Sequence, residues 1–475
     1  MGRPRDRPNI VLIVLDALRA DATEPYGAPA GSSPALADLA RAGVAAPAAR
    51  ATASWTLPSH IAMFTGQLAR GLGLGQAPGQ TPQGAAPVVR EQRDRLLAEV
   101  LRRSGYVTKG VSTNVWAGPR SGFGEGFDEY IELDASRHRE LGRNIAGRLR
   151  WNWDGLLARG DDGARQAEAV FARWLFERHE QPFFWFVNLV ECHSPYLPPR
   201  PYDGLSPIGR LRAADEAQRY LTFDSILRAW LGAAAVPQDA LERMRRLYAG
   251  SVRYVDAWVG GLLEALARRQ ALDDTLVVVC SDHGENFGEG GLMTHGLSLD
   301  ERLLRVPLIA AGPGHDELKG TLSLAELPAR LAAAIELDDH PFPDGLFAGV
   351  AVAQWDPFEL DDARLEQLVR DWGLDDEAVH RLRTPLTCAA SGRLKLVHDG
   401  EQELLFDLEA DPLEAEPLRE PSAIAERAGD ALVSLRAALD DPRVQATSAV
   451  TVAADVVSAE EATEIEAKMR LLGYL

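Results

Sequence analysis

The chain has 475 residues, of which 46% are hydrophobic and 25% are charged, proportions typical of a globular protein with a sizeable core. Its length suits two or more domains, or one large domain with a smaller one attached. Acidic residues outnumber basic residues by 70 to 50, giving a formal net charge of −20. Such a surface repels nucleic acid and anionic lipid, which disfavours both as general partners.

The first apolar segment, residues 10–15, is too short for a signal peptide or a membrane span. It ends at Asp16, no small-residue cleavage site follows, and no stretch approaches the roughly 20 apolar residues of a spanning helix. The three cysteines, Cys192, Cys280 and Cys388, lie far apart and form no C-x-x-C pair, as expected in a reducing compartment. We therefore expect a soluble cytoplasmic protein without a membrane span.

Apolar, β-branched segments alternate with amphipathic ones along the first 311 residues. The predicted strands are 9–15, 106–112, 183–190, 275–280 and 306–311. The predicted helices are 36–46, 95–104, 166–178 and 241–269. This alternation indicates the α/β class, with a mixed, mostly parallel sheet that is flanked by helices and buried on both faces.

The pattern changes near residue 350. Segments 393–397 and 403–408 flank Asp399-Gly400 and predict a β-hairpin, and 458–472 predicts a helix that opens with a capping box. We expect an α/β catalytic domain over 1–350 and an α+β subdomain over 351–475. Segments 117–165 and 196–236, which bear Gly, Pro and Arg, are predicted to be loops around the rim of the site.

Polar side chains follow three of the predicted strands: Asp16 after the first, Glu191 and His193 after the third, and Asp282 and His283 after the fourth. Working sites in open α/β sheets lie beyond the carboxyl ends of the strands, and carboxylates with an imidazole suit a divalent cation. Taken singly, Asp16 could instead be a helix N-cap, and Asp282-His283 a turn. Together they predict a metal site.

Residues 54–60, SWTLPSH, precede an apolar helical stretch. Thr56 and Ser59 each carry a hydroxyl that could act as a nucleophile. The alternative for either residue is a helix N-cap.

The ordered set of motifs resembles the sulfatase family of the alkaline phosphatase superfamily. The matching pieces are PNI at 8–10, DALRAD at 16–21, TLPSH at 56–60, GYVT at 105–108, HSPY at 193–196, SDHGE at 281–285, HG at 295–296, RVP at 305–307, LLFDL at 404–408 and LGY at 472–474. Each is short, but their common order covers most of the chain. The resemblance implies an alkaline-phosphatase-like sandwich and a metal-dependent ester hydrolase.

Two departures from the family pattern bear on the chemistry. Sulfatases of this kind carry Cys-x-Pro-Ser-Arg, whose Cys becomes formylglycine, whereas this chain has Thr56 and His60 at the Cys and Arg positions. Formylglycine cannot form from Thr, so none is expected. The counterpart of the sulfatase Gly-Lys-Trp-His pattern is Ser112-Thr113-Asn114-Val115, which lacks the Lys and the His.

The Thr at the nucleophile position resembles other members of the superfamily. Nucleotide pyrophosphatases/phosphodiesterases, lipoteichoic acid synthases and lipid phosphoethanolamine transferases use a metal-bound Thr there. The resemblance implies the metal ligands Asp16, Thr56, Asp282 and His283, with Thr56 also the nucleophile. A His ligand favours Mn²⁺ or Zn²⁺ over Ca²⁺. Ala17 stands where sulfatases often have a second Asp, which removes one ligand.

The resemblance also assigns roles to three histidines. His193 and His295 match positions that contact the ester oxygens or protonate the leaving group; alternatively, either ligates a second metal or is a buried polar histidine. His60 replaces the family's Arg, as an oxyanion contact or as a residue of the helix start. Asn114 is a candidate substrate contact, and Glu285 and Arg305 are expected to be structural or to support the site.

The implied function is cleavage of a phosphate monoester, phosphodiester or phosphonate ester through Thr56. One alternative is sulfate-ester hydrolysis without formylglycine. Another is a non-catalytic binding protein on the same fold, which the retention of Asp16, Thr56, Asp282 and His283 disfavours. The expected substrate is a small-molecule, lipid or saccharide ester; the sequence fixes neither its organic group, nor the number of metals, nor the oligomeric state.

Overall fold

The computed structural model describes residues 7–447, apart from 77–80, 134–160, 178–179, 344, 346, 348 and 359–361. A seven-stranded sheet lies at its centre in the order β2-β11-β7-β1-β6-β4-β5. The strands are β1 (Asn9–Leu15), β2 (Val44–Ala45), β4 (Val107–Ser112), β5 (Glu129–Glu132), β6 (Phe183–Leu189), β7 (Thr275–Cys280) and β11 (Leu308–Ala311). Strands β7, β1, β6, β4 and β5 are parallel, whereas β11 runs antiparallel to both β7 and β2. The predicted mixed, mostly parallel sheet is confirmed.

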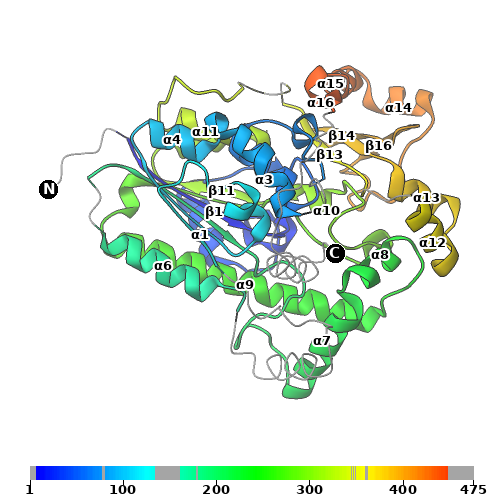
Figure 1. Cartoon of the computed structure of the whole chain (residues 1–475), viewed down its shortest axis with the longest axis horizontal. Coiled ribbons are helices and arrows are strands. Elements are labelled where there is room, and N and C mark those ends of the chain that lie inside the picture. Colours follow the sequence, from blue (N-terminus) through cyan, green and yellow to red (C-terminus); the bar gives the residue numbers. More distant parts are fainter. Residues whose placement is uncertain are drawn as a thin grey trace.

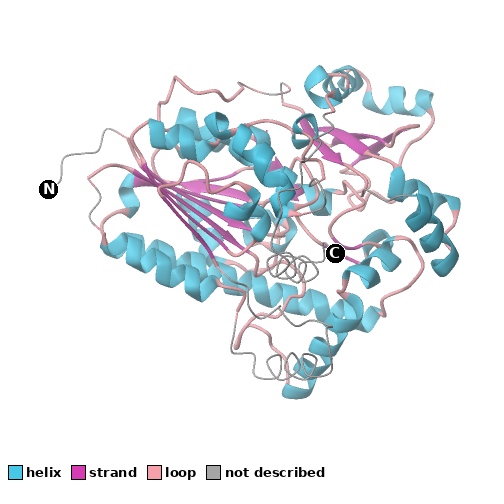
Figure 2. Cartoon of the chain, in the orientation of Figure 1, coloured by secondary structure: helices cyan, strands magenta, loops and turns pink. Residues whose placement is uncertain are grey.

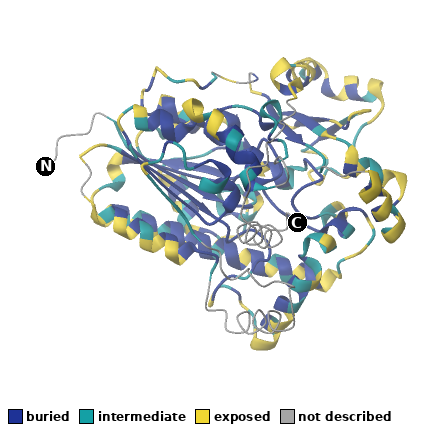
Figure 3. Ribbon diagram, viewed as in Figure 1, coloured by how far each residue is buried: buried dark blue, intermediate teal, exposed yellow. Residues whose placement is uncertain are grey.

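Helices cover both faces of this sheet (Figures 1 and 2). One face is covered by α6 (Ala164–Phe176) and α9 (Gln238–Arg268), with α1 (Pro34–Ala42) packed against α9. The other is covered by α3 (Pro82–Glu91), α4 (Leu97–Arg103) and α11 (Leu327–Ala334), and α2 (Thr56–Thr65) packs against α11. Every residue of β1, β6 and β7 is buried (Figure 3), which is why these strands are apolar along their whole length.

Two predicted elements are divided in the structure. Pro307 splits the predicted strand 306–311 into β10 (Arg305–Val306) and β11, because proline has no N–H for a ladder. Strand β10 pairs with β3 (Ala48–Arg50), which also pairs with β12 (Thr321–Ser323). The predicted helix 36–46 ends at Ala42, where Gly43 lets the chain pass against β11: a Cβ there would lie 2.0 Å from the Ala310 carbonyl oxygen.

The prediction of loops over 196–236 is wrong, because this segment contains α7 (Pro207–Tyr220) and α8 (Phe223–Trp230). Their N-caps, Ser206 and Thr222, accept hydrogen bonds from the Gly209 and Ser225 N–H groups, a signal that is visible in the sequence. Within 117–165, β5 is a strand, and 134–160 lie outside the described residues.

The C-terminal part contains a four-stranded antiparallel sheet in the order β13-β14-β15-β16. Its strands are β13 (Ala351–Trp355), β14 (Leu386–Ser391), β15 (Leu394–His398) and β16 (Glu403–Asp407). Helices α12 (Asp362–Trp372), α13 (Asp376–Arg383), α14 (Pro421–Ala428), α15 (Ala431–Leu439) and α16 (Pro442–Gln445) surround it. The predicted hairpin is confirmed in β15 and β16. The boundary at 350/351 stays a prediction, and the predicted helix 458–472 lies outside the described residues.

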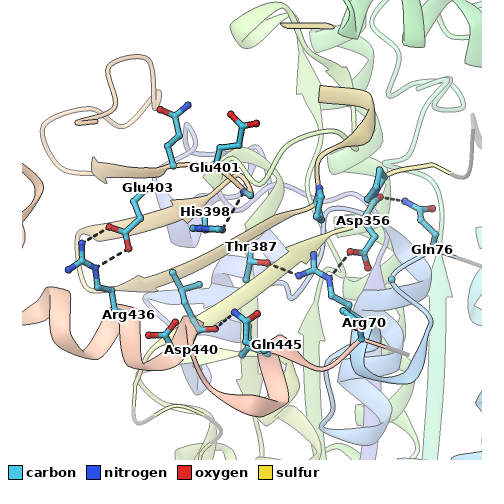
Figure 4. Close-up of a pocket in the computed structure, with 18 of the residues that line it drawn as sticks. Arg70, Gln76, Asp356, Thr387, His398, Glu401, Glu403, Arg436, Asp440 and Gln445 are labelled. Carbon is cyan, nitrogen blue, oxygen red and sulfur yellow. Dashed lines mark hydrogen bonds and ion pairs between the residues drawn. The ribbon is translucent and has the colours of Figure 1, made fainter. Parts of the chain in front are cut away.

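Arg70, which follows α2, contacts the C-terminal sheet at a cavity of about 860 Å³ (Figure 4). Its guanidinium donates to Asp356 Oδ1 at 2.6 Å, to Thr387 Oγ1 at 2.7 Å, and to the carbonyl oxygens of Trp355 and Leu386. All four acceptors belong to the C-terminal sheet or directly follow β13, so one side chain ties that sheet to the loop after α2. Within the described ranges, no helix is both long and apolar enough to cross a membrane.

We predict that Arg70→Met lowers the free energy of unfolding by about 2–4 kcal/mol, because several partly buried acceptors lose a charged donor. Arg436→Met is the matched control in the same cavity. Arg436 forms an ion pair with Glu403 at the surface, so its loss should cost about 1 kcal/mol or less. Urea or thermal unfolding of the two variants measures the difference; equal losses would contradict the role of Arg70.

Candidate active site at the carboxyl edge of the sheet

Four neighbouring parallel strands bring the polar residues of the site to one edge. Asp16 follows β1, Asp282 and His283 follow β7, Asn188 lies near the end of β6, and Asn114 follows β4. All five side chains are fully buried. Ligand atoms of Asp16, Asp282 and His283 lie within 4.8 Å of one another, as the convergence of parallel strand ends predicts.

The three side chains face one another through defined atoms. His283 Nε2 lies 3.6 Å from both Asp16 Oδ1 and Asp282 Oδ2. The other ring nitrogen, Nδ1, lies 2.9 Å from the Gly284 carbonyl oxygen, so Nδ1–H donates there and the Nε2 lone pair faces the carboxylates. Asp16 Oδ1 and Asp282 Oδ2 accept no hydrogen bond from any described residue.

The electrostatics of this group fit a divalent cation. Burial and the neighbouring Asp282 raise the pKa of Asp16 to about 6, and burial raises the pKa of Asp282. Burial and His295 lower the pKa of His283 to about 3, so its imidazole is neutral. Two buried carboxylates repel each other unless a positive charge lies between them. Two carboxylate oxygens and a neutral imidazole are a donor set for such an ion.

Thr56 is the first residue of α2, and its hydroxyl borders the same group. Thr56 Oγ1 lies 3.5 Å from His283 Nε2 and accepts a hydrogen bond from Asn114 Nδ2 at 3.1 Å. The same amide donates to Asp16 Oδ2 at 2.7 Å. Asn114 is itself fixed, because its Oδ1 accepts from the Trp116 N–H at 2.9 Å. Asn114 therefore couples the hydroxyl of Thr56 to the Asp16 carboxylate.

Neither hydroxyl of this segment is a helix cap. The N-cap position of α2 is Trp55, and no side chain caps it. The interpretation of Ser59 as an N-cap is wrong: its Oγ donates to the Asp282 carbonyl oxygen at 2.6 Å. Ser59 therefore supports the backbone that carries a predicted metal ligand.

Glu191 does not join the group, although its position after β6 suggested that it would. Its carboxylate accepts hydrogen bonds from the N–H groups of Asp162 and Ala164, at 3.1 and 2.9 Å. These groups lie at the start of α6, where an acceptor is needed for unpaired helix donors. Arg305 is exposed and donates to the Pro47 carbonyl oxygen, outside the site.

His193 and His295 lie beside the group. The ring centroids of His193 and His295 are 4.7 Å apart, and His295 is 4.3 Å from His283. His295 Nδ1 lies 3.0 Å from Glu285 Oε1, so Glu285 supports this histidine, as its sequence position suggested. Burial lowers the pKa of His295 and raises the pKa of Glu285 to about 7.

His60 lies one turn along α2, and its Nδ1 is 3.6 Å from Asp282 Oδ2. Its Nδ1 is 2.9 Å from the Thr56 carbonyl oxygen and its Nε2 is 3.4 Å from Asn188 Nδ2. These contacts support the first turn of α2; a direct role for His60 toward the ester stays a prediction. Asn188, which also lies 3.5 Å from Asp16 Oδ2, was missed, although a lone amide in the apolar FFWFVNL strand is a signal.

The family model named Sulfatase matches residues 8–327. A choline-sulfatase of Rhizobium meliloti is 30% identical over 272 residues, which cover 51% of this chain and 48% of that protein; the chain thus spans about half the length of this relative. A phosphonate monoester hydrolase of Agrobacterium radiobacter superposes with a TM-score of 0.60 at 20% identity, over 92% of this chain and 97% of that one.

A second phosphonate monoester hydrolase, from Silicibacter pomeroyi, superposes with a TM-score of 0.58 at 18% identity, over 91% of this chain and 97% of that one. At these identities the two structures show a shared fold. The family model covers more than half of the chain, and its range includes the strand ends and the start of α2 described above. The chain belongs to the sulfatase family.

Proposed function

We propose that this protein is a metal-dependent hydrolase or transferase that cleaves a phosphate monoester, phosphodiester or phosphonate ester through Thr56. The observation that carries the proposal is the position of the Thr56 hydroxyl. It lies 3.5 Å from His283 Nε2, at the edge of the Asp16, Asp282 and His283 group, and is held there by Asn114.

Asp16, Asp282 and His283, together with Thr56, would hold a divalent cation, Mn²⁺ or Zn²⁺ rather than Ca²⁺ because one ligand is an imidazole. When bound, the cation lowers the pKa of the nucleophilic hydroxyl and neutralises charge on the phosphoryl oxygens. Asn114 orients the hydroxyl through its Nδ2–H. The first turn of α2 also directs its peptide dipoles toward the same position, which favours negative charge there.

His193 and His295 are assigned to the ester oxygens and the leaving group. Their rings lie next to each other and to His283. Each has its Nδ1 engaged, by the Ser194 carbonyl oxygen at 2.9 Å and by Glu285. These contacts fix the orientation of both rings, and we assign their Nε2 atoms to the ester oxygens and the leaving group.

Phosphate is favoured over sulfate by what replaces the family's sulfate-binding groups. Thr56 cannot become formylglycine, His60 stands at the position of the family's Arg, and Thr113 and Val115 stand where the family has its Lys and His. Phosphate esters carry more charge on the transferred group and gain more from a cation. Sulfate-ester hydrolysis is the second candidate, because the choline-sulfatase relative is the similarity with the highest identity reported above.

The first prediction concerns the metal. Asp282→Asn should lower Mn²⁺ or Zn²⁺ affinity by at least about 10–100-fold, because it removes a charged ligand. Isothermal titration with each metal, together with metal analysis of protein purified without chelator, measures this. Asp256→Asn is the matched control: Asp256 is also buried, but it accepts from the N–H groups of Ala35 and Leu36 and should leave metal affinity unchanged. Equal affinity of Asp282→Asn and wild type would rule out the site.

The second prediction separates the two hydroxyls. Thr56→Ala should lose on the order of 10³-fold or more of kcat while the protein stays folded, whereas Thr56→Ser retains part of the activity. Ser59→Ala should cost about 1 kcal/mol of stability, because the bond to the Asp282 carbonyl is lost, with a modest change in kcat. Mass spectrometry of trapped enzyme should place a phosphoryl adduct on Thr56. An adduct on Ser59 would show that Ser59, and not Thr56, is the nucleophile.

The third prediction concerns the substrate. With Mn²⁺ or Zn²⁺ supplied, turnover of p-nitrophenyl phosphate, bis-p-nitrophenyl phosphate or p-nitrophenyl phenylphosphonate should exceed that of p-nitrophenyl sulfate. Thr56→Ala measured on every substrate controls for contaminating enzymes. A clear preference for the sulfate ester would select the second candidate function, and no turnover of any ester would favour a binding protein.

A further inference from the structure

The segment that carries His295, residues 293–301, has a strained backbone; we call it the His295 segment. Thr294, Gly296 and Leu297 have φ values of +53°, +114° and +50°, and left-handed conformations cost energy at residues other than glycine. Its regular structure is the two-residue strand β9 (Met293–Thr294), paired with β8 (Asn286–Phe287), and the start of α10 (Glu301–Leu304). Such a backbone persists when its surroundings hold it in place.

Two tryptophans hold the first part of this segment. Trp230, the last residue of α8, donates its Nε1–H to the Met293 carbonyl oxygen. A Cβ on Gly296 would lie 2.9 Å from Trp230 Cη2 and 3.3 Å from Trp355 Cη2, so the two indoles flank this glycine. Trp355 is the last residue of β13. The C-terminal sheet therefore contacts the residue that follows His295.

Lys395, in β15 of the same sheet, holds the second part. Its side chain is fully buried, and its ammonium donates to the Leu299 carbonyl oxygen. It also pairs with Glu414 Oε1 at 2.5 Å and Glu301 Oε1 at 3.7 Å. Glu414 Oε2 in turn accepts from the Glu301 N–H at 2.5 Å. One ammonium and one carboxylate thus fix both backbone groups at the end of the segment.

This ion cluster is costly unless all of its members are paired. Burial alone would lower the pKa of Lys395, but Glu414 and Glu301 together raise it above its usual value, so the ammonium stays charged. A buried ion pair adds less stability than an apolar pair of the same volume. Its advantage is directional, because Nζ reaches a carbonyl oxygen that an apolar side chain could not bind.

We propose that Lys395 is a positioning residue for His295, acting from the C-terminal sheet through the Leu299 carbonyl and the Glu301 carboxylate. The inference rests on the proposed function in one respect, that His295 acts on the ester. With its ends fixed by Trp230 and Lys395, the His295 segment places the imidazole against Glu285 and 4.3 Å from the ring of His283. The C-terminal sheet is then required for turnover, although it supplies none of the predicted metal ligands.

The test is a double-mutant cycle of Lys395→Met and His295→Ala. Lys395→Met alone should lower kcat by about 10–100-fold with KM changed by less than about 3-fold, since a misplaced group loses catalysis before binding. In the His295→Ala background, the same substitution should change kcat by less than about 2-fold. Equal losses in both backgrounds would show that Lys395 acts through general stability and would overturn the proposal.

Lys109→Met is the matched control. Lys109 in β4 is also buried and pairs with Glu129 and Glu177, but these partners lie away from the His295 segment. It should cost stability without coupling to His295. If Lys395→Met does not fold, Glu414→Gln replaces it in the cycle, because it removes the charge of the partner at nearly constant volume and should couple to His295 in the same direction.

Hydrogen exchange measured by mass spectrometry tests the same proposal without depending on enzymatic turnover. Lys395→Met or Glu414→Gln should speed exchange in peptides spanning 293–301 while leaving β1 unchanged, and Lys109→Met should leave 293–301 unchanged. Unaltered exchange over 293–301 would overturn the proposal even if activity fell. If wild type turned over no ester, the proposed function would fail, and the exchange arm alone would decide whether Lys395 holds the segment.

Discussion

Two buried carboxylates, Asp16 and Asp282, face each other across a neutral imidazole. Their mutual repulsion is the constraint on which the rest of the site depends. The outer oxygens of the pair are supported by Asn114 and by the N–H groups of Ala17 and His283. The inner oxygens, Asp16 Oδ1 and Asp282 Oδ2, point toward His283 Nε2. Among the described residues these two oxygens have no hydrogen-bond donor, and such an arrangement is stable in a low dielectric when a cation neutralises the charge. The sheet delivers both carboxylates because β1 and β7 are adjacent and parallel.

Among the described residues, the Thr56 hydroxyl contacts the neutral groups of Asn114 and His283. Asn114 and Asn188 supply amide N–H groups near Asp16, and the imidazoles of His60 and His283 have lowered pKa values because of burial. Under the proposed function, positive charge for the transferred anionic group would come chiefly from a bound cation.

The two sheets have different tasks. The seven-stranded sheet supplies the convergent strand ends, while the C-terminal sheet and α8 hold the segment that carries His295. Arg70 binds carbonyl oxygens of the C-terminal sheet from the segment after α2, and Lys395 binds the Leu299 carbonyl oxygen from that sheet. Charged donors are suited to this task because they satisfy several acceptors at once, which an apolar contact cannot do.

The sequence by itself determined the α/β class, the central strands, the C-terminal hairpin and the convergence of Asp16, Asp282 and His283. Short, continuous, β-branched apolar segments favour buried strands, and side chains that directly follow neighbouring parallel strands tend to lie at one edge of the sheet. Glu191 is the exception, because its carboxylate turns to the start of α6. Only the tertiary structure decided the partners of the remaining polar residues. Ser59 binds the Asp282 carbonyl, Glu191 binds the start of α6, and Lys395 reaches Leu299. Each of these contacts joins residues far apart in the chain, and local sequence patterns carry no information on which distant backbone group a side chain will meet.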